Sequence, residues 1–228
     1  RHTCRENLKK GADLLKLFIT PGVPDPASTF VPSFLSLKEI STAVSEGARL
    51  GIPTAAHCIG GQGLKDCIDG GVDVIEHMYM AAEQDVERLA ASRCVVDLTS
   101  GIFLDPSREE FLSPANALKV RLNRSRVREN VARIIKARLP FVLGTDAYHG
   151  FLYREVGYAV ELGADPVTAI QGVTSRAARV CRLEDRIGKL ENGMEADIIA
   201  VEGNPLEDVS RLSQVGLVMK GGGVYRQP

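Results

Sequence analysis

Four short, largely apolar runs each lead into a residue that can bind a metal ion or carry a proton. The residues that end these runs are Lys16, His57, His77 and Asp146. Neutral imidazoles and carboxylate oxygens are the ligands that Zn²⁺ and similar divalent ions take in proteins. A single histidine is more often a packed or surface residue than a ligand, but two at the ends of consecutive runs, followed by an aspartate, form a more specific pattern. The spacing therefore predicts a divalent metal site.

The elements that must position these residues are buried strands. The run before Asp146 lies between Pro140 and Gly144 and is typical of a fully buried strand. We expect strands over residues 12–20, 52–57, 72–76, 94–98 and 141–147, and helices over 36–50, 64–69, 84–91, 116–138 and 166–180. Strands that alternate with helices pair in parallel, and ligands at the strand ends suit a (β/α)₈ barrel better than an open sheet.

Three connections and one glycine cluster complete this α/β pattern. We expect the loops Pro21–Ser36, Ile102–Pro114 and Tyr148–Tyr153 to line a pocket, because long loops in compact domains are often lids or binding segments. The glycines at 60, 61 and 63 are expected to form a flexible turn, and they lack the Gly-Lys-Ser/Thr ending of a phosphate loop. The arginines of helix 116–138 are expected to form a solvated face, opposite a buried stripe.

From Leu183 onward the pattern changes to short β segments separated by turns, over residues 197–201, 215–220 and 224–226. Such segments after a run of βα units indicate a second, smaller sheet. We therefore expect one domain over residues 1–182 and part of a small β domain over residues 183–228.

Composition narrows the class of protein. The 228 residues are 44% hydrophobic and 25% charged, which is typical of a globular protein. The net charge of -1 does not favour binding to nucleic acid or to an anionic membrane, and the absence of Trp does not favour base stacking. The five cysteines are widely spaced and are expected to be reduced and mostly buried. No signal peptide or membrane-length apolar run occurs, and we expect a cytoplasmic location.

Lys16 lies inside the apolar run Leu14–Ile19, where a buried ammonium would cost several kcal/mol or shift its pKa. Two interpretations stay open at this point. The lysine stem packs while its amine reaches solvent at the strand end, or chemical modification turns the lysine into an anionic ligand.

Several motifs in order resemble the metal-dependent amidohydrolase superfamily, in particular its imidazolonepropionase-like and prolidase-like members. The matching stretches are Gly11-Ala-Asp-Leu-Leu-Lys16, Ala55-Ala-His57, Val74-Ile-Glu-His77 and Gly144-Thr-Asp146-Ala147, and the tail adds Thr174-Ser-Arg-Ala-Ala178, Ala196-Asp-Ile198 and Gly203-Asn-Pro-Leu206. Each stretch alone is weak, but the ordered combination covers nearly the whole chain and is specific.

The resemblance implies a (β/α)₈ TIM barrel of amidohydrolase type with part of a small β-sandwich domain. It implies that Lys16 is carbamylated and bridges two Zn²⁺ or similar ions, that His57 and His77 bind one of them, and that Asp146 binds the other and acts as general base and acid. Two ions about 3.5 to 4 Å apart can deprotonate a shared water and polarise a substrate carbonyl. The resemblance thus implies a hydrolase of an amide-type C–N bond.

One family feature is absent from the sequence. The His-x-His pair of the first barrel strand has no counterpart, and His2 stands alone in a helix-like segment. Counting the βα units assigns barrel strands four to eight to this chain. We therefore expect the chain to be the C-terminal part of a longer enzyme that pairs with a missing N-terminal segment or forms a homo-oligomer.

The expected substrate is a small molecule: a dipeptide, an N-acyl amino acid or a cyclic amide. Tyr148, His149 and Arg154, with Tyr153, are candidates for binding its carboxylate, but each is equally well explained as a surface or packing residue. Two rival hypotheses remain. One is a mononuclear enzyme with unmodified Lys16, acting on imidazolone-like rings or as a deaminase, and the other is a catalytically incomplete fragment that serves as an assembly module.

Overall fold

The structure is a computed structural model that describes residues 1–23, 25–28, 30–146 and 149–227, with the side chain of His149 outside the description. The chain divides into two compact units, residues 1–140 and residues 141–228, and each is described by itself. Within the described residues, no helix is both long and apolar enough to span a membrane.

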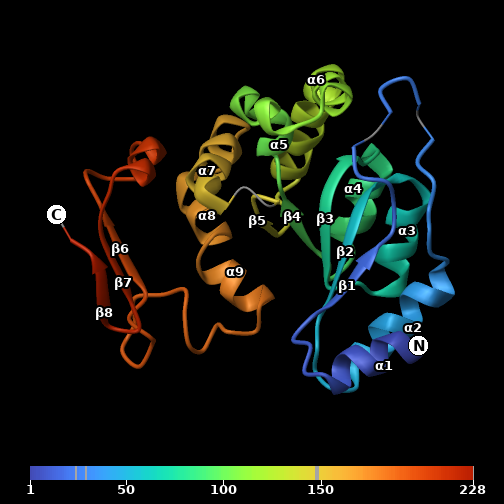
Figure 1. The fold of residues 1–228 in the computed structure, drawn as a ribbon, viewed down its shortest axis with the longest axis horizontal. Coiled ribbons are helices and arrows are strands. Elements are labelled where there is room, and N and C mark those ends of the chain that lie inside the picture. Colours follow the sequence, from blue (N-terminus) through green and yellow to red (C-terminus); the bar gives the residue numbers. More distant parts are fainter. Residues whose placement is uncertain (24, 29, 147–148, 228) are drawn as a thin grey trace. The chain divides into compact units, whose positions relative to one another are not determined.

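The first unit contains four parallel strands in the order β1-β2-β3-β4 (Figure 1). Helices connect consecutive strands, so the predicted α/β pattern with a parallel sheet is confirmed. The strands are β1 (Leu15–Phe18), β2 (Thr54–Gly60), β3 (Val74–Met80) and β4 (Val95–Leu98). The helices are α1 (His2–Lys9), α2 (Leu37–Ala48), α3 (Gly61–Gly70), α4 (Glu83–Ala90), α5 (Gly101–Leu104) and α6 (Pro114–Lys136).

Strand β2 is the centre of the core, because every one of its residues is buried. Helices α2 and α3 pack against each other, and Figure 1 shows both beside β1 and β2. Helix α2 begins with the predicted capping box, in which Ser36 and Glu39 satisfy each other's backbone N–H groups. Its buried face includes Ile40 and Ala43, whereas Ala48 in its last turn is exposed.

The glycine cluster after His57 is not the flexible turn that the sequence suggested. Gly60 ends β2, while Gly61 and Gly63 lie in the first turn of α3. A Cβ at Gly60 would lie 2.7 Å from the Met80 carbonyl oxygen, and one at Gly63 would lie 2.7 Å from a methyl group of Ile19. These glycines therefore allow close packing of helix against strand rather than flexibility.

Two further expectations about the first unit are corrected. The segment 102–114 is not an open loop, because it contains most of α5 and a 3₁₀ helix over Pro106–Phe111. Helix α6 has the predicted buried stripe, including Val127, Val131 and Ile134, but three of its arginines are not on a solvated face. Arg124, Arg126 and Arg133 are partly buried and bind the Phe103 carbonyl, the Met80 sulfur and the Ala81 carbonyl, respectively.

The second unit combines β5 (Phe141–Leu143) and three helices with a separate antiparallel sheet of order β6-β7-β8. The helices are α7 (Leu152–Glu161), α8 (Pro166–Gly172) and α9 (Ser175–Val180), and the strands are β6 (Ile198–Val201), β7 (Val215–Lys220) and β8 (Gly223–Arg226). The single helix expected over 166–180 is divided at Thr174, whose hydroxyl donates to the Ile170 carbonyl (2.8 Å) and whose backbone is not helical.

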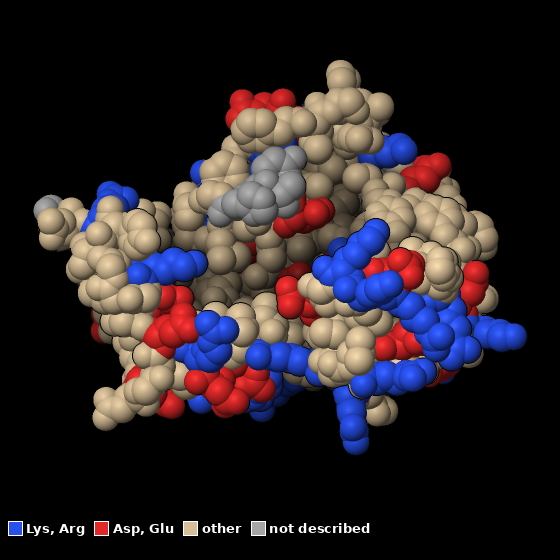
Figure 2. Space-filling view, turned by 60° about the horizontal axis from the view of Figure 1, so that its bottom comes forward, with Lys and Arg blue, Asp and Glu red and all other residues tan. Residues whose placement is uncertain are grey.

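Basic and acidic side chains are interspersed on the face that Figure 2 shows, in keeping with the net charge of -1. All five cysteines are free thiols, and Cys58, Cys67 and Cys94 are buried.

Candidate metal centre

The C-terminal parts of β2 and β3 bring His57 and His77 together. Their ring centroids are 4.5 Å apart in an edge-on arrangement, and both side chains are buried. On the neighbouring strand β1, the ring of Phe18 stacks on His57 at 4.2 Å. Two of the four predicted metal-binding residues are therefore in contact within one unit.

A local departure from strand geometry places His77 on this face. Phe18, His57 and Glu76 occupy paired positions on adjacent strands, so their side chains share one face of the sheet. Strict alternation would turn His77 to the opposite face. Instead, His77 and Met78 have left-handed backbone conformations, with φ of 76° and 54°, and both Glu76 and His77 reach the same site. Such backbone strain is characteristic of functional positions.

Each imidazole uses one nitrogen in a hydrogen bond and keeps the other for a further partner. His57 Nε2 lies 3.1 Å from the Pro21 carbonyl oxygen, and His77 Nδ1 lies 2.7 Å from Thr99 Oγ1. Metal-binding histidines in proteins typically donate their second ring N–H to an oxygen in this way. The two rings therefore fit a divalent ion, with His57 Nδ1 and His77 Nε2 as the nitrogens left to bind it.

Burial lowers the pKa of His77 to about 3, and the nearby His57 and Lys16 act in the same direction. His77 is therefore a neutral imidazole near neutral pH, which is the form that binds a metal ion.

Thr99, directly after β4, contributes to the site through hydrogen bonds. Its hydroxyl contacts both His77 Nδ1 and the Tyr79 hydroxyl, the latter at 2.6 Å, and Tyr79 also donates to the Thr99 carbonyl oxygen (3.0 Å). All three side chains are buried. Threonine is not a favoured Zn²⁺ ligand, so the residue type gave no indication of a role. The position of Thr99 directly after β4 was the only indication in the sequence.

Lys16 is not buried as its apolar neighbours suggested: 47% of its side chain is exposed. Its ammonium forms an ion pair with Glu76, which lies 3.7 Å from His77 Nε2 through the same carboxylate oxygen. Glu76 is not among the residues predicted for the site. Glu76 lies in the Val74-Ile-Glu-His77 stretch, which could have indicated a role. However, neighbouring residues of a strand normally point to opposite faces of the sheet, so Glu76 and His77 were not expected at the same site.

The remaining predicted residues lie in the second unit. Asp146 follows β5, is exposed, and has a left-handed φ of 46°. Tyr148 and the side chain of His149 lie outside the described residues. Arg154, on α7, donates from Nε to the Tyr153 hydroxyl (3.1 Å), and its guanidinium lies 4.4 Å from the centre of the Phe151 ring.

The two histidines do not form a complete metal site by themselves. In the part of the chain that the structure describes, no group of three or more His, Cys, Asp or Glu side chains is arranged to hold an ion. An ion bound by these two imidazoles would need further ligands, and oxygen ligands such as a carboxylate or a carbamate have suitable chemistry.

A family model shows where this arrangement belongs. The amidohydrolase family matches residues 1–224, nearly the whole chain. This chain belongs to the amidohydrolase family. The relationship predicted from the ordered motifs is thereby confirmed.

Known members of the amidohydrolase family include close matches in sequence and fold. Ochratoxinase from Aspergillus niger is 31% identical over 243 residues, covering 100% of this chain and 49% of the relative. A solved Xaa-Pro dipeptidase with bound methionine is 30% identical with a TM-score of 0.85, covering 97% of this chain and 56% of that one. An adenine deaminase from Mesorhizobium japonicum is 34% identical over 80 residues, covering 35% of this chain and 13% of the relative. The chain thus spans about half the length of the curated ochratoxinase it matches.

Proposed function

We infer that this chain carries part of the active site of a metal-dependent hydrolase that cleaves an amide-type C–N bond. The expected substrates are dipeptides, N-acyl amino acids or cyclic amides. The observation that carries this proposal is the pair of contacting imidazoles, each with one nitrogen engaged by an oxygen. Membership of the amidohydrolase family and similarity to an ochratoxinase and an Xaa-Pro dipeptidase support it.

The proposed fold of the whole enzyme is a (β/α)₈ barrel, with this chain supplying strands four to eight. Residues 1–182 would belong to the barrel and residues 183–228 to a small β-sandwich domain. The parallel strands of the first unit and the antiparallel sheet of the second support this assignment.

In the binuclear form, Lys16, His57, His77 and Asp146 would hold two divalent ions, with Zn²⁺ the expected metal. When bound, the metal would activate water and polarise the substrate carbonyl. Lys16 would act as a carbamate, formed when its neutral amine attacks CO₂ and the N–H proton of the adduct is released to water. Because the ammonium must first lose a proton, the Glu76 carboxylate that contacts it is well placed to accept that proton.

Asp146 would act on protons during the reaction. Its carboxylate would take a proton from the attacking water and then deliver it to the leaving nitrogen, so that the C–N bond breaks as an amine departs. His57 and His77 would be held in orientation by the Pro21 carbonyl and the Thr99 hydroxyl, respectively.

A mononuclear enzyme is the second candidate. The ion pair between Lys16 and Glu76 favours it, because it keeps Lys16 as an unmodified cation. The local similarity to an adenine deaminase agrees with this alternative, in which the reaction would be deamination or opening of an imidazolone-like ring. A catalytically incomplete fragment acting as an assembly module is the remaining alternative.

Metal analysis combined with intact mass separates these candidates. The measurement is made on the purified protein that contains this chain, prepared in bicarbonate, with Lys16→Arg as the variant that cannot form the carbamate and Lys10→Arg as its matched control. Two metal ions per chain, the added mass of one CO₂ that Lys16→Arg abolishes, and amide hydrolysis would support the binuclear hydrolase. One ion and unmodified Lys16 would support the mononuclear form, and metal-free protein without turnover would contradict both.

A further inference from the structure

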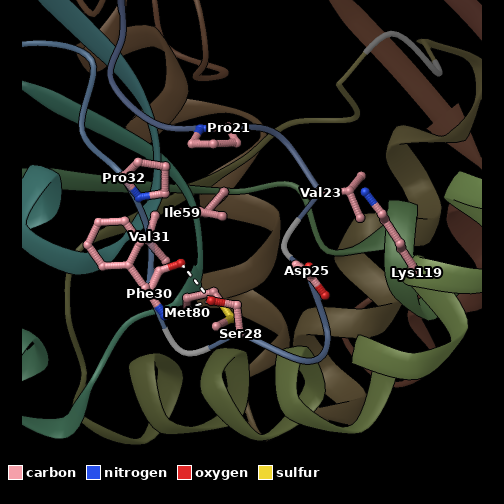
Figure 3. Close-up of a pocket in the computed structure, with 10 residues that line it drawn as sticks. All are labelled: Pro21, Val23, Asp25, Ser28, Phe30, Val31, Pro32, Ile59, Met80 and Lys119. Atoms are coloured by element: carbon pink, nitrogen blue, oxygen red, sulfur yellow. Dashed lines mark hydrogen bonds between the residues drawn. The ribbon is translucent and has the colours of Figure 1, made fainter.

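A pocket of about 250 Å³ lies beside the candidate metal centre, within the first unit (Figure 3). Most of the residues that line it are apolar, and the loop after β1 supplies the larger share of them. Val23, Phe30 and Val31 come from this loop, Ile59 comes from β2, and Met80 comes from β3. Figure 3 shows Phe30 and Val31 on one side and Val23 on the other.

The pocket shares part of its wall with the histidines. Pro21 lines the pocket, and its carbonyl oxygen is the group that contacts His57 Nε2 at 3.1 Å. Ile59 follows His57 by two residues on β2, and Met80 follows His77 by three on β3. A molecule in this pocket would therefore lie next to the proposed reaction centre.

Two opposite charges occupy one side of the pocket. Lys119 reaches from α6 toward Val23, and Asp25 lies nearby in the loop after β1 (Figure 3). Asp25 Oδ1 accepts a hydrogen bond from the Ala27 N–H (2.9 Å). Among the described residues, no ion pair involves the Lys119 ammonium. The hydroxyl of Ser28 is engaged with the Phe30 backbone and is not part of this polar pair.

We propose that this pocket binds the leaving amino acid of the amide substrate, with the α-carboxylate on Lys119, the nitrogen beside Asp25 and an apolar side chain against the apolar wall. In an α-amino acid, the carboxylate, the nitrogen and the side chain are all attached to the same α-carbon. The size agrees, because a cavity of about 150 Å³ holds benzene, so the pocket accommodates an aromatic or large aliphatic side chain. The inference rests on the proposed amide hydrolysis and specifies which side of the scissile bond this pocket recognises.

The charges also match the direction of the reaction. In the substrate, the nitrogen is an amide N–H that can donate to Asp25. After cleavage the same nitrogen becomes an ammonium and forms an ion pair with Asp25. The carboxylate stays on Lys119 throughout and holds the leaving group in register.

Equilibrium binding tests the subsite separately from hydrolysis. Calorimetric titrations of the metal-free protein containing this chain compare L-phenylalanine with phenethylamine, which lacks the carboxylate, and 3-phenylpropionate, which lacks the ammonium. We expect L-phenylalanine to bind best and removal of the carboxylate to weaken binding by at least about tenfold, since hydrogen bonds to charged groups contribute that much.

Variants assign the effect to named residues. Lys119→Met keeps most of the stem and removes the charge, so it should abolish the preference for L-phenylalanine over phenethylamine, while Lys119→Arg should retain it. Lys136→Met, at the other end of α6, is the matched control and should bind like the parent protein. Val23→Phe fills the pocket and should exclude L-phenylalanine by at least about tenfold relative to glycine.

The outcomes separate the subsite from the proposed reaction. No detectable binding of L-phenylalanine, equal binding of phenethylamine, or an unchanged preference in Lys119→Met would overturn the subsite, even where amide hydrolysis is observed. Binding with the expected dependence on Lys119 in a protein that hydrolyses no amide would retain the subsite and overturn the proposed function.

Discussion

At the scale of single residues, the backbone at His77 decides the composition of the site. A left-handed conformation costs an L-residue roughly 1–2 kcal/mol, and both His77 and Met78 adopt it. The surrounding contacts sustain this strain: the Thr99 hydroxyl holds His77 Nδ1, and the Tyr79 hydroxyl holds Thr99 in turn. The result is that Glu76 and His77, adjacent in sequence, face the same site.

Replacing Thr99 with Val removes the hydroxyl while keeping the shape of the buried side chain. Because the imidazole then loses the acceptor that orients it, we expect Zn²⁺ affinity to fall by about 10- to 100-fold. Competition titration with a chromogenic chelator measures the affinity, and Thr99→Ser, which retains the hydroxyl, should bind like the parent protein. Equal affinities in Thr99→Val and the parent, with both folded by circular dichroism, would show that Thr99 does not position His77.

At the scale of elements, charged side chains join helices to their neighbours. Three arginines of α6 bind the Phe103 and Ala81 carbonyl oxygens and the sulfur of Met80 on β3, and Asn130 donates to the Tyr79 carbonyl oxygen (2.7 Å). Between α1 and α2, Glu46 accepts hydrogen bonds from Arg1 (2.5 Å) and Arg5 (2.7 Å). Arginine and asparagine side chains on the helices thus donate hydrogen bonds to oxygen and sulfur atoms of the segments that they pack against.

The pair between Glu46 and the arginines predicts a pH dependence of stability. The hydrogen bond from Arg5 comes first among the groups that lower the pKa of Glu46, which falls from 4.5 to about 2. A lowered folded-state pKa gives stability that is present above pH 4.5 and lost as the pH falls toward 2.

Urea unfolding at several pH values, followed by circular dichroism, tests this dependence. Glu46→Gln should lower the free energy of unfolding at neutral pH and should show a shallower decline between pH 4.5 and 2 than the parent protein. Glu129→Gln, on the exposed part of α6, is the comparison variant. Identical slopes for the parent and Glu46→Gln would refute the assignment.

At the scale of the whole molecule, each unit leaves apolar surface uncovered. In the first unit, Phe18 is 56% exposed, and its ring stacks on that of Phe34, which is 55% exposed. In the second, Ile199 and Val224 are exposed on the small antiparallel sheet. Contiguous exposed apolar surface marks a site of association, which agrees with the prediction that the chain pairs with another segment or another copy.

We expect the chain, when expressed alone, to self-associate through the exposed surface of Phe18 and Phe34. Phe34→Ser should weaken dimer formation by about 10- to 100-fold, because a buried Phe side chain contributes about 1.5 to 3 kcal/mol. Sedimentation equilibrium measures the change, with Leu190→Ser as a control at an exposed apolar residue of the second unit. A chain that is monomeric at every concentration, or an unchanged dimer constant in Phe34→Ser, would contradict the prediction.

The sequence by itself was enough to predict the parallel α/β pattern, a second, smaller sheet near the C-terminus and the family. These features depend on local signals: apolar runs, capping residues such as Ser36 and Glu39, and ordered short motifs. It also located the two histidines, because each ends an apolar run. The metal ligation of all four predicted residues stays a prediction.

Tertiary structure decided what depends on contacts between distant segments. The partners of Lys16 and His77 could not be read from the sequence, because His77 shares the site face with Glu76 only through its left-handed backbone, and Thr99 comes from another strand. The glycines after His57 looked like a turn because nothing local reveals that Ile19 and Met80 pack against them. Alternation and composition describe one segment at a time, whereas the pocket beside Pro21 and the orientation of each imidazole arise only when several segments meet.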